Sequence, residues 1–141
     1  MNLIARIRDS QFLRFAVVGG TGFFVNEAVL FAAIRFLRAG PHTGWIVAFL
    51  VTVTYTWWGN RKLTFRSDAA RGGRAVALEW ARFVMANALG ALVNYAIYEA
   101  LITFAGAPLN SPYIALACGT LAGLLFNFTL SKRLVFRAPP A

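Results

Sequence analysis

Four of the polar side chains that interrupt the long apolar runs of this 141-residue sequence could contact a ligand: Asn26 and Glu27 in the first run, Asn94 in the third and Asn127 in the fourth. An amide offers hydrogen-bond donors and an acceptor together, and a carboxylate accepts from hydroxyl groups or carries a proton. Such groups are costly in hydrocarbon, so each needs a partner on another helix or on a ligand. For the asparagines the sequence leaves both partners open, and for Glu27 it also leaves open a structural pair with an asparagine.

Basic residues gather where the apolar runs end. Arginine can hold a phosphate through two parallel hydrogen bonds and lysine adds a point charge, so we expect an anion-binding cluster there. The alternative is a topology signal with general attraction to anionic lipids, worth about 1 kcal/mol per residue. Recurrence at matched positions along the chain favours the cluster. Its expected members are Arg14, Arg61, Lys62, Arg82, Lys132 and Arg133.

Composition excludes several classes of protein. Hydrophobic residues make up 59% of the chain and charged residues only 13%, whereas a soluble domain carries about a quarter charged residues. A single cysteine and a single histidine exclude a disulfide framework and a Cys/His metal cluster. Without paired carboxylates at a water-facing position, we expect no catalytic residues, no cofactor and no enzyme. The net charge of +9 is explained by membrane topology, so we expect no nucleic-acid partner.

Four apolar stretches approach the roughly 20 residues that cross about 30 Å of hydrocarbon. They run over about residues 12–36, 44–60, 80–104 and 112–131. The alternation typical of barrel strands is missing. We therefore predict a single all-α integral membrane domain over residues 1–141 with four transmembrane helices.

The basic residues also predict the orientation. Twelve of the 14 Lys and Arg residues lie on one side of the predicted spans, among them Arg6, Arg8 and Arg137. By the positive-inside rule, both termini and the central connection are expected in the cytoplasm, and the chain in the inner (cytoplasmic) membrane. Arg35 and Arg38 are left on the other side.

The sequence repeats itself. A shift of 68 residues aligns Arg14 with Arg82 and Asn26 with Asn94, and a shift of 71 aligns residues 60–66 with 131–137. Because each copy holds two spans, both enter the membrane from the same side, which predicts two parallel two-helix repeats. The last span also carries a stripe of small residues that is predicted to pack, within the chain or between copies. It consists of Ala115, Gly119 and Gly123.

Three motifs resemble the GtrA-like family over about Phe12 to Arg137. They are Arg-Phe-x-x-x-Gly-x-x-Gly from Arg14, Gly-x-x-Val-Asn in the first and third spans, and Asn-Phe-Thr-Leu-Ser-Lys-Arg-Leu-Val-Phe from Asn127. The resemblance implies a small four-span protein associated with polyprenyl-phosphate-linked sugars and cell-surface polysaccharide modification. The basic cluster would then bind the phosphate, and Asn26, Glu27, Asn94 and Asn127 would contact the sugar. One departure from the family's pattern is Glu27, where an aspartate or a neutral residue is expected.

Two functions of different classes follow. The first is translocation of a polyprenyl-phosphate-linked monosaccharide through the lipid bilayer. The second is a non-transporting anchor whose partner is a polyprenyl-phosphate glycosyltransferase. A third hypothesis is a small proton-coupled exporter, because such a protein would also carry a carboxyl group in its first span, as Glu27 does. This similarity is superficial. A homodimer is an attractive assembly, because four helices barely enclose a path for a sugar.

Overall fold

The computed structural model describes residues 9–66 and 69–136, and these residues form helices without any strand. The predicted all-α class is therefore confirmed. Arg6, Arg8 and Arg137 lie outside the described residues. The helices, in chain order, are α2 (Gln11–Arg35), α3 (Pro41–Gly59), the π-helical turn η1 (Asn60–Thr64), α4 (Gly73–Phe104), α5 (Pro112–Leu130) and the π-helical turn η2 (Ser131–Val135).

Local sequence signals explain where the helices begin. The hydroxyl of Ser10 accepts a hydrogen bond from the backbone N–H of Leu13 at 3.3 Å, so it caps the first turn of α2. Helices α3 and α5 both begin at a proline, which needs no backbone donor in the first turn. Helix α4 begins at Gly73, seven residues before the predicted third span, because the small residues of the connection continue it.

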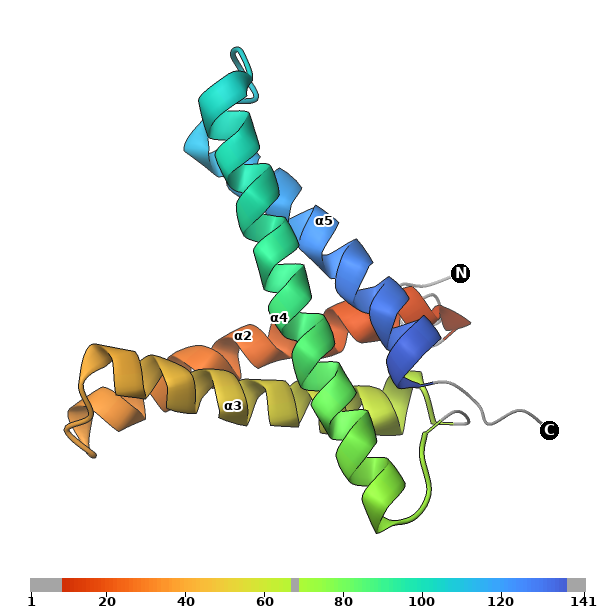
Figure 1. The fold of residues 1–141 in the computed structure, drawn as a ribbon. Helices are drawn as coiled ribbons and strands as arrows, with labels where there is room; N and C mark the ends of the chain where they lie inside the picture. The colour runs from red at the N-terminus through yellow and green to blue at the C-terminus, as the bar shows by residue number, and fades with distance from the viewer. Residues whose placement is uncertain (1–8, 67–68, 137–141) are drawn as a thin grey trace. The chain divides into compact units, whose positions relative to one another are not determined.

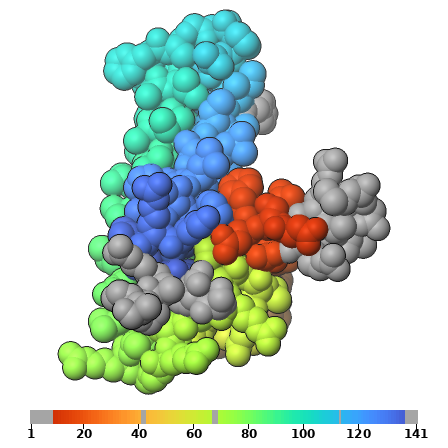
Figure 2. Space-filling model, turned by 90° about the vertical axis from the view of Figure 1, so that its right-hand side faces the viewer, coloured from red at the N-terminus to blue at the C-terminus, as the bar shows by residue number. Residues whose placement is uncertain are grey.

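The described residues form two compact units, one ending at Trp80 and the other beginning at Ala81. In unit 1, α2 and α3 run antiparallel and side by side (Figure 1). In unit 2, the remainder of α4 runs antiparallel to α5, and α5 packs along α4 in both views (Figures 1 and 2). Each unit therefore contains a helical hairpin whose second helix continues directly into a π-helical turn.

The two π-helical turns have the same internal structure. In η1 the N–H of Phe65 donates to the carbonyl of Asn60 at 2.8 Å, and in η2 the N–H of Phe136 donates to that of Ser131 at 2.8 Å. Both phenylalanines are almost completely buried. Phe65 packs edge-on against Phe15 with ring centroids 6.2 Å apart, and Phe136 packs against Phe83 at 6.0 Å.

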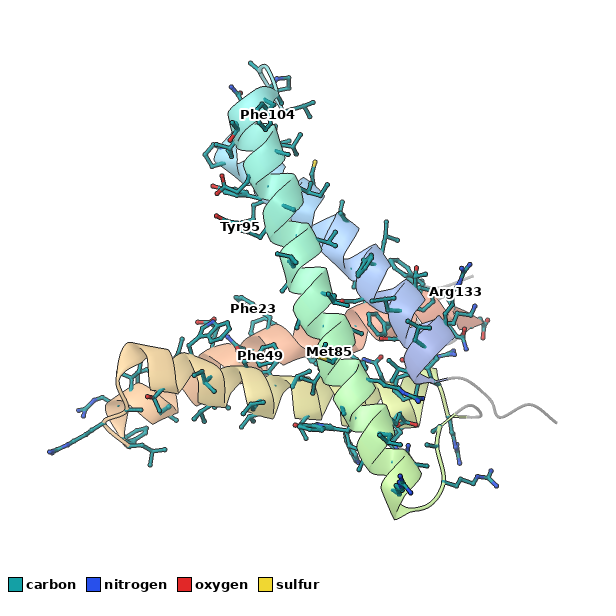
Figure 3. All side chains as sticks on the ribbon, viewed as in Figure 1. Phe23, Phe49, Met85, Tyr95, Phe104 and Arg133 are labelled. Carbon is teal, nitrogen blue, oxygen red and sulfur yellow. The ribbon has the colours of Figure 1, made fainter. Side chains whose placement is uncertain are left out.

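Three of the described helices are long and apolar enough to cross a membrane: Gln11–Arg35, Gly73–Phe104 and, with its π-turn, Ile114–Val135. Their large apolar side chains point outward, as Phe23 and Phe104 do in Figure 3. Exposed apolar surface of this extent needs lipid or protein to cover it. The prediction of a membrane protein is supported, and three of its four spans have a matching helix. The remaining helix, α3, has 19 residues and is not among the helices that are long and apolar enough to cross a membrane.

Close backbone approach holds α4 against α5. A Cβ added at Gly119 would lie 2.6 Å from the carbonyl oxygen of Asn94, and one added at Gly123 would lie 2.9 Å from that of Gly90. Ala115, the third member of the small-residue stripe, is fully buried. The prediction that this stripe packs is confirmed, and its partner is α4 of the same chain.

Gly119→Ala is therefore expected to force the two helices apart, because its methyl group would meet the backbone carbonyl of Asn94 as well as the side chain of that residue. Such overpacking costs about 1–3 kcal/mol, so the melting temperature in detergent should fall. Gly20→Ala on α2 is the matched control, since nothing lies within 4 Å of its added Cβ. An equal melting temperature for both variants would contradict the packing role of Gly119.

Candidate functional site

Two of the asparagines predicted to contact a sugar meet at the α4–α5 interface of unit 2. A Cβ added at Gly90 would collide with the amide of Asn127, so this amide lies directly on the bare backbone of α4. Asn94 is one turn further along α4, where it faces Gly119 and Gly123. The structure therefore brings Asn94 and Asn127 together within one helix pair.

Polar atoms at this interface are left without partners. The Oδ1 atom of Asn127 is buried and has no hydrogen-bond partner. Ser131, one turn later, is fully buried, and its Oγ atom also has none. An unpaired buried acceptor or donor costs about 1–3 kcal/mol. Asn127 and Ser131 thus keep unused hydrogen-bonding capacity along the α4–α5 pair. Together with Asn94 they form what we call the polar line.

The polar line ends at exposed basic residues. Lys132 and Arg133 follow Ser131 in η2, and both side chains are exposed. Arg133 projects away from the helix pair (Figure 3), and the ammonium of Lys132 lies 5.9 Å from the ring centre of Phe128. Arg82, also exposed, lies at the same end of unit 2, because its neighbour Phe83 packs on Phe136. Three predicted phosphate ligands are therefore grouped at one end of this unit.

Unit 1 uses its corresponding polar residues differently. Asn26 accepts a hydrogen bond from the hydroxyl of Thr52 at 3.4 Å, and so its amide oxygen has a partner on α3. Thr56 occupies the position that aligns with Asn127, and its hydroxyl donates to the carbonyl of Thr52 at 3.0 Å in the same helix. A threonine pairs with its own backbone in this way, so it leaves no unpaired group at the interface.

The same contrast continues at the end of α3. Asn60, which aligns with Ser131, is almost completely buried. Its Nδ2 donates to the carbonyl of Thr56 at 2.9 Å, and its Oδ1 accepts from the hydroxyl of Thr64 at 2.9 Å. Both the nitrogen and the oxygen of the buried Asn60 amide are thus hydrogen-bonded, whereas the buried hydroxyl of Ser131 in unit 2 is not.

Arg61 forms an ion pair that the sequence did not reveal. Its Nη1 donates to Oε1 of Glu79 at 2.6 Å, and Glu79 is only 2% exposed. The same carboxylate accepts from Trp57 Nε1 at 3.0 Å and from the backbone N–H of Ala70 at 2.6 Å. Arg61 also donates to the carbonyl of Ala70. The pair therefore clamps the connection before α4 onto the end of α3.

In unit 1 the predicted basic residues also lie at one end, because Phe15, the neighbour of Arg14, packs on Phe65 directly after η1. Arg14 is half-buried in the first turns of α2, and Lys62 is exposed beside Arg61. Glu27 is exposed on α2, while its neighbour Asn26 turns toward α3. The structure does not bring Asn26 and Glu27 into one polar surface.

The described residues hold no group of His, Cys, Asp or Glu side chains that could bind a metal ion. The family model for the GtrA/DPMS transmembrane domain matches residues 14–136. The chain belongs to this family. The GtrA/DPMS family consists of membrane proteins linked to polyprenyl-phosphate sugars, so the family expected from the sequence motifs is confirmed. No curated protein matches the chain as a relative.

Glu79→Ala is expected to destabilise this GtrA/DPMS protein by about 3 kcal/mol, because it leaves a half-buried guanidinium without its carboxylate. The double variant Glu79→Leu with Arg61→Met should recover most of that loss, since both charges are then absent. Thermal unfolding in detergent measures both values. Lys62→Gln, at the exposed neighbouring position, is the control and should change little. Additive losses in the double variant would show that the two residues act independently.

Proposed function

We propose that this protein translocates a polyprenyl-phosphate-linked monosaccharide across the cytoplasmic membrane for the synthesis or modification of cell-surface polysaccharide. Membership of the GtrA/DPMS family supports the class of substrate. The protein makes and breaks no covalent bond in this proposal. Its task is to lower the free energy of moving a polar head group through hydrocarbon while the polyprenyl chain stays in lipid.

The unpaired Oδ1 of Asn127 is the observation that carries the proposal. Once α5 moves away from Gly90 and uncovers it, a buried acceptor that no protein group satisfies can accept a hydrogen bond from a sugar hydroxyl without first breaking an internal hydrogen bond. Asn94 and Ser131 extend this capacity along the same helix pair. The polar line would therefore replace water for the sugar as it passes.

The basic end of unit 2 suits the phosphate. Arg133 and Arg82 can each offer two parallel N–H groups, and Lys132 adds a point charge. All three are exposed, in contrast to Arg61, which Glu79 already neutralises. We therefore assign phosphate binding at this face to Lys132, Arg133 and Arg82, and we give Arg61 a structural role.

Helix α3 would be the fourth helix to cross the membrane. Its 19 residues rise about 28 Å, close to the thickness of the hydrocarbon layer. Four crossings in two parallel two-helix repeats would place both termini and the connection between α3 and α4 in the cytoplasm, where the excess of basic residues belongs. Lys132 and Arg133 would then receive the substrate at the inner leaflet.

Proteoliposomes that carry a polyprenyl-phosphate monosaccharide in one leaflet test this function, with an impermeant reagent that reports sugar exposure. The protein should abolish the sidedness of the lipid, and Lys132→Gln with Arg133→Gln should slow the exchange at least about ten-fold, because two charge-assisted contacts to phosphate are lost.

Arg71→Gln with Arg74→Gln is the matched control, because it removes the same charge from exposed positions at the start of α4 and just before it. It should leave the rate within about two-fold of the wild type. Sidedness that persists with the wild-type protein for several sugars would reject translocation. It would favour the alternative, a membrane anchor for a glycosyltransferase.

A further inference from the structure

The end of α2 has a backbone conformation that usually requires glycine. Arg38 has φ = 51°, which places it in the left-handed region. The N–H of Ala39 donates to the carbonyl of Ala33, six residues earlier, at 3.0 Å, so the chain turns back over the last turn of the helix. A left-handed residue at the end of a helix is normally glycine, because a side chain there is disfavoured by contact with its own backbone. An arginine at this position therefore calls for a reason other than helix termination.

Arg38 lines an open groove at the same end of α2. The groove encloses about 520 Å³ and is lined by Glu27, Leu30, Phe31, Ile34, Arg35 and Arg38. Leu30, Phe31 and Ile34 provide an apolar wall, and the two guanidinium groups lie toward the end of the helix. Glu27 is eight residues before Arg35, about 12 Å deeper along the helix axis. We call this feature the Arg38 groove.

The charges of the groove match an anion at its mouth. Among the residues that the structure describes, no carboxylate forms an ion pair within 4.0 Å with Arg35 or Arg38. Two exposed arginines at adjacent turns can hold one phosphate through several charge-assisted bonds. The apolar wall beside them can accommodate a hydrocarbon chain. This combination fits a phosphate that carries a lipid chain.

We propose that the Arg38 groove is a second binding site for the phosphate of the lipid-linked sugar, at the end of unit 1 that is remote from Arg14. Arg35 and Arg38 bind the phosphate, and the first isoprene units lie on Phe31 and Ile34. The 25 residues of α2 span about 37 Å, so a phosphate in this groove is at the opposite membrane face from one at the start of the helix. This inference rests on the proposed function, since it supplies the site where a translocated lipid is held after crossing.

Arg38→Gly separates binding from folding. Glycine adopts the left-handed conformation without strain, so the variant should keep or raise the melting temperature of the protein. It nevertheless removes one of the two guanidinium groups. Arg71→Gly is the matched control, because it makes the same substitution at an exposed position in the connection before α4.

Native mass spectrometry of the detergent-solubilised protein, titrated with farnesyl phosphate, counts the occupied sites. We expect two tightly bound molecules on the wild type and on Arg71→Gly, and one on Arg38→Gly, with the affinity of the lost site reduced at least about ten-fold. Retention of both molecules at unchanged affinity by Arg38→Gly would overturn the inference. So would equal competition by inorganic phosphate, which lacks a chain, or by phosphatidylglycerol, which would indicate a general lipid site.

The variant with Lys132→Gln and Arg133→Gln distinguishes this inference from the proposed function. If it loses one farnesyl phosphate and Arg38→Gly loses the other, both sites stand. If it keeps both molecules while Arg38→Gly loses one, the groove is supported and the assignment of phosphate binding to Lys132 and Arg133 is wrong.

Discussion

The absence of water in hydrocarbon imposes one constraint on every polar side chain of this protein: it must find a partner within the protein or in what the protein binds. In unit 1 the asparagines along α3 and its partner helix meet the constraint internally. Asn26 pairs with Thr52, and Asn60 is bonded at both ends of its amide. Unit 2 does not, because the Asn127 oxygen and the Ser131 hydroxyl are buried without partners. Each hairpin thus has its own π-helical turn and its own aromatic contact of the same kind. The two hairpins differ in whether their buried amide and hydroxyl groups are hydrogen-bonded.

The basic ends of the two hairpins differ in the same sense. In unit 1 a buried glutamate neutralises Arg61 and ties down the following connection. Removing a charge from water in this way is tolerable only because Trp57 and the backbone of Ala70 satisfy the remaining lone pairs. The aligned residue of unit 2, Lys132, is exposed and rests over an aromatic ring. In unit 1 the charged group at the end of the hairpin therefore stabilises the fold. In unit 2 the corresponding charged group is free to bind a ligand.

Much of the fold could be predicted from the sequence. The apolar runs and their proline starts anticipate each helix to within a few residues, except that α4 continues back to Gly73. The stripe of Ala115, Gly119 and Gly123 also anticipates a packing face on α5, but it left open whether the partner is α4 or another copy of the chain. Glu79 could not be placed, because nothing in a local pattern shows that a carboxylate 18 residues away pairs with Arg61. Its one signal is that it is an acid in a strongly basic stretch. The left-handed Arg38 was equally hidden, since the sequence there lacks the glycine that marks such a turn.

Asn127→Thr shows whether the unpaired oxygen of Asn127 is needed for translocation, because it gives unit 2 the residue that unit 1 has at the aligned position, Thr56. The hydroxyl would bond to its own helix, so the melting temperature should be unchanged or higher. Translocation of the polyprenyl-phosphate monosaccharide in proteoliposomes should nevertheless fall at least about ten-fold, because the free acceptor is gone. A variant that is as stable as the wild type and translocates at the wild-type rate would contradict the account.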